Sequence, residues 1–145
     1  MTSREDALSH LYTRLIDSRD GYRAAGERAE SPAIRAVLSD MATRRETDAA
    51  QIRQFLAGAG VHPSDDGSTL AAAHRAFLSL KDRVTGSGDE AILREIVRGE
   101  ETLHDAYDAA LDASGAADPE FAFLREQQDR LKAGIGTLQA RAEAA

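Results

Sequence analysis

The chain has 145 residues, of which 42% are hydrophobic, 30% are charged and 5% are aromatic. This length suits one domain with a sizeable core, and a net charge of −7 gives no basic surface for nucleic acid and disfavours an anionic membrane as a partner. The absence of cysteine excludes disulfides, thiol catalysis, iron–sulfur clusters and cysteine-ligated zinc. Because the chain has neither a stretch of about 20 apolar residues nor a signal-like N-terminus, we expect a cytoplasmic protein.

Turn-forming segments divide the chain into helices that carry apolar residues at helical spacing. Ser31 is placed to cap a helix whose first residue is Pro32. After the glycine-rich break at 85–90, Ser87 or Asp89 can cap the next helix. Together with the loop at 58–68 and the break at 114–120, these signals predict helices near residues 4–29, 33–57, 69–84, 89–113 and 119–142.

The lengths of the connections predict how the four long helices are arranged. Short turns make the first two long helices antiparallel, and the last two likewise. The connection of about thirty residues between these pairs is long enough to run the full length of a bundle. We therefore expect one all-α domain over residues 1–145, a ferritin-like four-helix bundle of two antiparallel hairpins with the short helix in the long crossover.

A glutamate interrupts the apolar face of the third long helix. Successive helical residues are rotated by about 100°, so Leu93, Glu100 and Tyr107, which are spaced by seven, share one direction. Glu100 therefore lies at the centre of the buried face, His104 lies within about 50° of that centre, and Glu101 is turned to the flank. A buried carboxylate requires a partner, because an unpaired one is costly to desolvate.

The other long helices also carry polar residues on their apolar stripes, near the midpoint of each helix. These residues are Arg19, Arg45, Asp48, Gln127 and Gln128. The midpoints lie level in the expected topology, so the sequence predicts one polar layer through the bundle centre. We expect Glu100 to pair with Arg19 or Arg45. The remaining hydrogen bonds of the layer are expected from Gln128, Tyr22 or Tyr107.

This layer argues against the di-metal centre that many ferritin-like proteins contain. Such a centre needs an inward glutamate on two helices and Glu-x-x-His on each of the other two. The fourth long helix offers no inward carboxylate, and two inward arginines would lie where the cations belong. The alternative interpretation is a site for iron or another divalent metal. Its ligands would be Glu100 and His104, with Glu101 or Glu46 moving in from the flank.

The stretch LIDSRDGYRAAGERAESPAIRAVLSDMATRR, the block AAHRAFLSLKDRVTGSGDEAILREIVRGEE and Tyr107 resemble a bacterial ferritin-like four-helix-bundle family described only as domain of unknown function 2383. The similarity covers about residues 7–113, and its signatures are Gly21-Tyr22, His74-Arg75 and Arg98-Gly99-Glu100. Phe77 stands where the family often has tryptophan. His104 stands where relatives often have a residue that cannot bind metal, which weakens a family-wide metal role for it. The resemblance implies the fold and implies no activity.

No motif for catalysis is present in the sequence. It contains no glycine-rich phosphate loop, no Ser/His/Asp arrangement and no cysteine–histidine pair. We therefore expect a non-enzymatic module without a cofactor, acting in protein interaction or, by analogy with the family, in a stress response. Its partner would be an unknown protein or a second copy of the chain in a homodimer. The alternative is an iron-handling or oxidase-like metal-binding protein.

Overall fold

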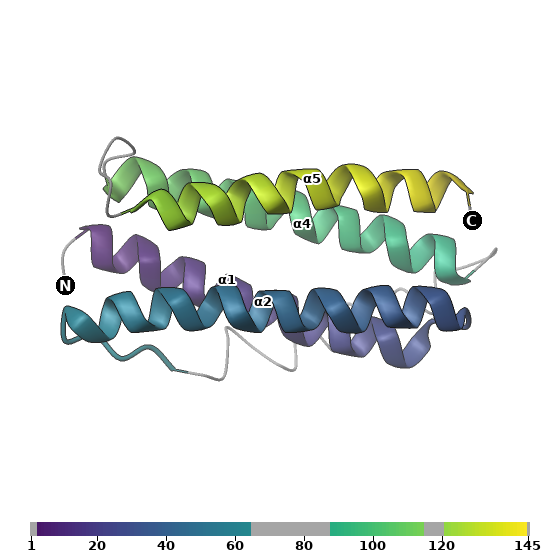
Figure 1. The fold of residues 1–145 in the computed structure, drawn as a ribbon, viewed down its shortest axis with the longest axis horizontal. Coiled ribbons are helices and arrows are strands. Elements are labelled where there is room, and N and C mark those ends of the chain that lie inside the picture. The colour runs from purple at the N-terminus through teal and green to yellow at the C-terminus, as the bar shows by residue number, and fades with distance from the viewer. Residues whose placement is uncertain (1–2, 65–87, 115–120, 145) are drawn as a thin grey trace.

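The computed structural model describes residues 3–64, 88–114 and 121–144. Its helices, in chain order, are α1 (Ser3–Arg28), α2 (Pro32–Gly58), α4 (Gly88–Ser114) and α5 (Ala122–Ala144). The described ranges contain no strand, and the predicted all-α four-helix bundle is confirmed (Figure 1). None of these four helices has the length and the apolar character needed to cross a bilayer. The expected short helix at 69–84 lies outside the described residues.

The turn between α1 and α2 follows the predicted capping pattern. Ser31 has an extended backbone, its Oγ accepts a hydrogen bond from the backbone N–H of Ile34 at 3.4 Å, and Pro32 is the first helical residue. Beyond the other end of α2, Gly60 has a φ of +78°, a left-handed conformation that favours glycine. Local residue types therefore set both ends of α2, within one residue of the predicted range 33–57.

The helices form two antiparallel hairpins, α1 with α2 and α4 with α5 (Figure 1). α1 also packs against α4, which joins the hairpins. α1 and α5 run in one direction along the bundle, and α2 and α4 run in the other. α2 therefore ends at the opposite end of the bundle from where α4 begins, as a connection that runs the length of the bundle requires.

Asp89 joins the start of α4 to the turn between α1 and α2. Its Oδ1 accepts a hydrogen bond from the backbone N–H of Glu30 at 2.8 Å, and its Oδ2 accepts one from Ser31 at 3.0 Å. The sequence suggested Asp89 as a cap for its own helix, whereas the structure places it in the first turn of α4, bound to the other hairpin. Two charge-assisted hydrogen bonds to backbone groups thus connect the hairpins at this end of the bundle.

The apolar core consists of two clusters, one toward each end of the bundle. The Phe121 cluster comprises Leu8, Leu11, Tyr12, Leu15, Ile16, Ala49, Ile52, Leu56, Leu103, Tyr107, Ala110, Leu111, Phe121, Leu124 and Leu131. The Leu93 cluster comprises Tyr22, Ala25, Ala29, Leu38, Met41, Ala42, Ile92, Leu93, Ile96, Val97, Leu138 and Ala142. Of the buried polar residues, Arg45, Asp48 and Glu100 lie near the midpoints of α2 and α4, where one cluster gives way to the other. Gln127 lies nearer the start of α5, between Leu124 and Leu131 of the Phe121 cluster.

Candidate functional site

Arg45 on α2 and Glu100 on α4 meet inside the bundle. Nη2 of Arg45 lies 2.5 Å from Oε2 of Glu100, and the two residues are only 3% and 2% exposed. Nε of Arg45 makes no hydrogen bond, so the guanidinium acts through its Nη atoms. A hydrogen bond between two ionised groups is stronger than one between neutral groups, and here both groups are buried.

A second buried carboxylate continues the charged layer toward α5. Nη1 of Arg45 lies 3.7 Å from Oδ2 of Asp48, which is 6% exposed. On the other side of Asp48, Oδ1 lies 3.4 Å from Nη2 of Arg130. The acids and bases therefore alternate from Glu100 through Arg45 and Asp48 to Arg130. Opposite charges meet at each step of this chain, and the two acids balance the two bases.

An amide completes the layer beside these charges. Gln127 on α5 is fully buried, and its Oε1 accepts a hydrogen bond from the hydroxyl of Tyr107 at 2.7 Å. Its Nε2 donates to Oε1 of Gln51 at 2.6 Å and to the backbone carbonyl of Asp48 at 3.3 Å. Both ends of the buried amide thus have partners, as burial of a polar group requires. These bonds connect α2, α4 and α5.

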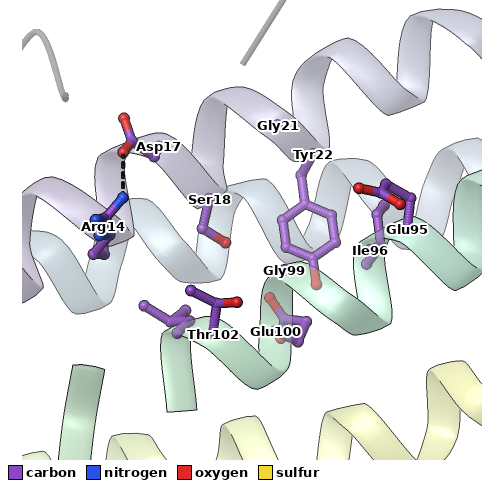
Figure 2. A pocket seen from close by; sticks show the side chains of 11 residues that line it. Arg14, Asp17, Ser18, Gly21, Tyr22, Glu95, Ile96, Gly99, Glu100 and Thr102 are labelled. Carbon is purple, nitrogen blue, oxygen red and sulfur yellow. Dashed lines mark ion pairs between the residues drawn. The ribbon is translucent and has the colours of Figure 1, made fainter. Parts of the chain in front are cut away.

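Tyr22 brings α1 into contact with the layer. The guanidinium carbon of Arg45 lies 5.7 Å from the centroid of the Tyr22 ring, within the range of a cation–π contact. The hydroxyl of Tyr22 points toward the carboxylate of Glu100 (Figure 2). This buried oxygen makes no hydrogen bond, although its interaction with Glu100 acts to lower the pKa of that carboxyl. The layer therefore contains one tyrosine with a bonded hydroxyl, Tyr107, and one without.

Burial and charge act against each other on the ionisable groups of the layer. Burial raises the pKa of Glu100 and of Asp48, and the charge of Arg45 opposes both of these rises. Burial acts to lower the pKa of Arg45, but the adjacent carboxylate of Glu100 reverses this effect and raises it. Burial also raises the pKa of Tyr22 and Tyr107, so both hydroxyls keep their protons at neutral pH. Arg45 is thus the charge that makes two buried acids tolerable.

Two residues that the sequence assigned to the layer lie elsewhere. Arg19 is turned to the flank of α1, where it pairs with Asp20 at 3.1 Å and with Glu46 at 3.5 Å. Gln128 is partly buried and donates to Oδ1 of Asp108 at 2.6 Å on the outer side of α4 and α5. In both cases an acidic partner near the surface draws the side chain away from the interior.

Arg130 and Gln51 belong to the layer and were not predicted from the sequence, whereas Gln127 was predicted without its role. The sequence placed Gln127 on the apolar stripe but expected the hydrogen bonds from Gln128, and in the structure Gln127 makes the bond to Tyr107. Arg130 and Gln51 are exposed residues that reach the layer by the length of their side chains. The only signal for Arg130 in the sequence is its position three residues after Gln127, one helical turn further along α5.

The residues of the alternative metal site do not converge. Glu46 is exposed and pairs with Arg19 and Arg23, and Glu101 is exposed. Nδ1 of His104 lies 3.7 Å from Asp108 instead of turning toward Glu100. The interior donors, Glu100 and Asp48, both contact Arg45. A metal centre needs several converging donors without a cation among them, so these residues do not fit one.

A different group of possible metal ligands lies on the surface of α4. In the described ranges, one set of three side chains brings its donor atoms within 4.8 Å of one another, namely His104, Asp105 and Asp108. His104 is half-buried and the two aspartates are exposed. Asp108 also accepts the hydrogen bond from Gln128. This group is separate from the interior layer and shares only His104 with the predicted ligands.

The bundle surface is open on both sides of the ion pair. The α1–α4 opening has a volume of about 250 Å³ and is lined by residues that include Ser18, Gly21, Tyr22, Ile96, Gly99 and Glu100 (Figure 2). The α2–α5 opening has a volume of about 290 Å³ and is lined by residues that include Arg44, Arg45, Thr47, Asp48, Arg130 and Gly134. Glu100 thus borders one opening and its partner Arg45 borders the other.

Comparison with known proteins identifies the family of the chain. A family model described as Domain of unknown function (DUF2383) matches residues 3–113. This range contains α1, α2 and α4 with Tyr22, Arg45, Asp48 and Glu100, whereas Gln127 and Arg130 on α5 lie outside it. No curated protein and no solved structure matches the chain significantly. Because the match covers well over half of its length, the chain belongs to the family of domains of unknown function DUF2383.

Proposed function

We propose that this protein is a non-enzymatic helical module that acts through protein interaction or in a stress response, and that a buried ion-pair layer occupies the place of a metal centre in its core. The observation that carries this proposal is the contact of 2.5 Å between Nη2 of Arg45 and Oε2 of Glu100. The guanidinium supplies, from within the chain, the positive charge that a metal ion would otherwise supply to this carboxylate.

The composition of the whole layer supports the same interpretation. Asp48 is shared between two guanidiniums, those of Arg45 and Arg130. Two acids and two bases balance in the layer, so no further cation is required for charge neutrality. Gln127, with both ends of its amide bonded, adds hydrogen bonds but no ligand of the carboxylate or imidazole type.

The arrangement of two antiparallel hairpins, with α2 and α4 running in the same direction, supports a ferritin-like affiliation. The absence of cysteine supports a cytoplasmic location, where disulfides are rare.

The surface of the described ranges bears on the kind of partner. Every Leu, Ile, Val, Phe, Met and Tyr side chain that the structure describes is buried or half-buried. A partner that docks on this part of the chain would therefore meet polar and charged groups and small residues such as alanine, without a large exposed apolar side chain. We propose that dimer formation, or the binding of another protein, depends on charge and weakens as salt is added.

Metal analysis tests the proposal against its alternative. The protein is purified without chelators, its metal content is measured, and ferrous iron is then added under air. We expect far less than one metal ion per chain and no iron–oxo absorption band. Near-stoichiometric metal together with such a band would overturn the proposal. Metal that is lost in His104→Ala and kept in Glu101→Ala would instead identify the surface group on α4, since Glu101 is exposed on the same helix but is not part of that group.

Light scattering tests the interaction part of the proposal. The molar mass of the full chain is measured over a range of concentrations, first at low salt and then at about 1 M salt, where charge interactions are screened beyond about 3 Å. We expect any dimer to dissociate at high salt. A dimer that is equally stable at both salt concentrations would contradict a polar interface.

A further inference from the structure

A polar group without a partner lies in the α1–α4 opening. Tyr22 is 3% exposed, its side chain lines the opening, and its hydroxyl makes no hydrogen bond. The hydroxyl points toward Glu100 in the same opening (Figure 2). A buried hydroxyl without a hydrogen bond lowers the stability of the folded chain. A bound molecule that donates a hydrogen bond to this oxygen would offset this effect.

Two further oxygen atoms accompany the hydroxyl of Tyr22. Arg45 contacts Glu100 through Oε2, and a carboxylate has about four lone-pair positions, so Glu100 can accept from a further donor. The hydroxyl of Ser18 also lies in the opening and, like that of Tyr22, acts to lower the pKa of Glu100, although burial keeps that pKa raised. The carboxylate of Glu100, Oη of Tyr22 and Oγ of Ser18 together offer three acceptors. A primary ammonium group has three N–H donors and no acceptor, which matches this set.

The size and the lining of the opening limit what the bound molecule can contain besides its ammonium group. A volume of about 250 Å³ lies below the usual range for ligand pockets, about 300–1,000 Å³, so only a small molecule fits. Ile96 and Leu103 give the walls an apolar character. Gly99 leaves space, because a Cβ atom at this position would meet nothing within 4 Å. A short alkyl chain suits such walls.

The charged groups of the lining bear on the kind of molecule that binds. Three carboxylates, those of Asp17, Glu95 and Glu100, line the opening together with one arginine, Arg14, which lies 3.9 Å from Asp17. The arginines that pair with Glu95 and Glu100 are not among the lining residues. Each of the three carboxylates is paired with an arginine, but the charged groups that an entering molecule contacts directly are mainly acidic, so the lining favours a hydrogen-bond donor over an anion.

We propose that the α1–α4 opening is a binding site for a small organic cation, a primary ammonium ion on a short apolar chain, whose ammonium group contacts Glu100, Tyr22 and Ser18. The site goes beyond the proposed function and does not depend on it, since it needs neither a protein partner nor the absence of metal elsewhere in the chain.

Three matched probes test this site in the full chain. We titrate n-butylammonium into isotope-labelled protein and follow the backbone amides by NMR. 1-Butanol has the same alkyl chain without the charge, and butyltrimethylammonium has the charge without N–H donors. We expect saturable shifts at Gly21, Tyr22 and Gly99 with n-butylammonium. The loss of one good hydrogen bond or of the charge should weaken the binding of each control probe by about tenfold or more.

Two variants locate the binding. Tyr22→Phe removes only a hydroxyl that has no partner, so the fold is kept and n-butylammonium should bind several-fold more weakly. Gly99→Leu places a side chain in the opening and should abolish binding. Gly136→Leu is the matched control, because Gly136 is also helical, also has free space around an added Cβ and does not line the opening. It should bind like the native chain.

Several results would overturn the site. These are the absence of saturable shifts at the three amides, equal binding of 1-butanol and n-butylammonium, and unchanged binding in Tyr22→Phe or in Gly99→Leu. Metal content and molar mass, which test the proposed function, do not enter this experiment. A failure here is therefore distinct from a failure of that proposal.

Discussion

The α1–α4 and α2–α5 openings lie on either side of one ion pair, but their linings carry opposite charge. Glu100 belongs to a lining with three carboxylates and one arginine. Arg45 belongs to a lining with three arginines and one aspartate. The pair that joins them has its acid toward the acidic side and its base toward the basic side. Charge is therefore polarised across the bundle as well as balanced within the layer.

The two openings also differ in how their polar groups are bonded. On the α2–α5 side, Asp48 contacts two guanidiniums, and Arg130 extends the chain of charges toward the surface. On the α1–α4 side, the hydroxyl of Tyr22 is buried without a partner. Each side thus holds a buried polar atom without a hydrogen bond, Nε of Arg45 on the α2–α5 side and the hydroxyl of Tyr22 on the α1–α4 side, but of these two atoms only the hydroxyl can accept a hydrogen bond from a cation. This contrast explains why we place the small-molecule site between α1 and α4.

Arg45→Met should have the largest effect on stability, because it removes the guanidinium that pairs with both Glu100 and Asp48. It leaves Glu100 buried without its cation and removes one of the two cations beside Asp48. We expect a loss of about 3–5 kcal/mol in the free energy of unfolding at neutral pH, measured by urea denaturation. Arg44→Met is the control, since Arg44 is the next residue but is exposed and pairs with Asp40, and it should change stability by less than about 0.5 kcal/mol. Equal losses in the two variants would contradict the account.

The stability of Arg45→Met should also depend on pH in a defined direction. Burial already raises the pKa of Glu100, and removing Arg45 removes the main opposing effect, so the pKa rises further. The folded variant then binds a proton at Glu100 more readily than the unfolded chain does. Its stability is therefore retained below the usual carboxyl pKa of about 4 and is lost as the pH rises through the folded pKa. Urea denaturation at several pH values should show the gap to the native chain widening as the pH rises, and a narrowing gap would contradict this prediction.

The amide of the layer gives the next largest expected effect. Gln127→Leu leaves the hydroxyl of Tyr107 and the amide of Gln51 without this partner. We expect a loss of about 1–3 kcal/mol in the free energy of unfolding. Gln128→Leu is the matched control on the same helix, because its bond goes to the exposed Asp108, and its cost should stay below about 0.5 kcal/mol. If Gln128→Leu is the more destabilising variant, Gln128 and not Gln127 is the glutamine of the buried layer.

Variants of Tyr107 and Tyr22 compare the stability effect of a hydrogen-bonded hydroxyl with that of an unbonded one. Tyr107→Phe removes the donor to Gln127 and should cost about 1 kcal/mol. Tyr22→Phe removes a hydroxyl without a partner and should change stability by less than about 0.5 kcal/mol, or increase it. Both are measured by the same urea denaturation. If Tyr22→Phe is the more destabilising variant, its hydroxyl has a partner after all.

Helical phase accounts for the part of the site that the sequence could predict. A rotation of about 100° per residue brought Glu100, Arg45 and Asp48 to the interior, where the structure places them. Helical phase alone does not predict which of Gln127 and Gln128 is fully buried, because adjacent residues can both lie near the edge of one apolar stripe. It also does not show that Arg19 is drawn to Glu46, a residue on another helix.

The rest of the site depends on distances between helices. The residue pattern within one helix does not give these distances. The openings exist because small residues such as Gly99 leave space at particular helix contacts. Arg130 reaches Asp48 from an exposed position through the length of its side chain. The bond of Asp89 to Glu30 and Ser31 joins residues almost sixty positions apart. The order and the bounds of the described helices, by contrast, follow from local turn signals and were predicted closely.

A double-mutant cycle on Arg45 and Glu100 tests the central claim most directly. The free energy of unfolding is measured for the native chain, Arg45→Met, Glu100→Gln and the double variant at neutral pH. If the two side chains stabilise each other across the interior, the double variant should be more stable than the sum of the single changes predicts, by at least about 1 kcal/mol. If the losses of the two single variants add up to the loss of the double variant, Arg45 and Glu100 do not stabilise each other, and the account is contradicted.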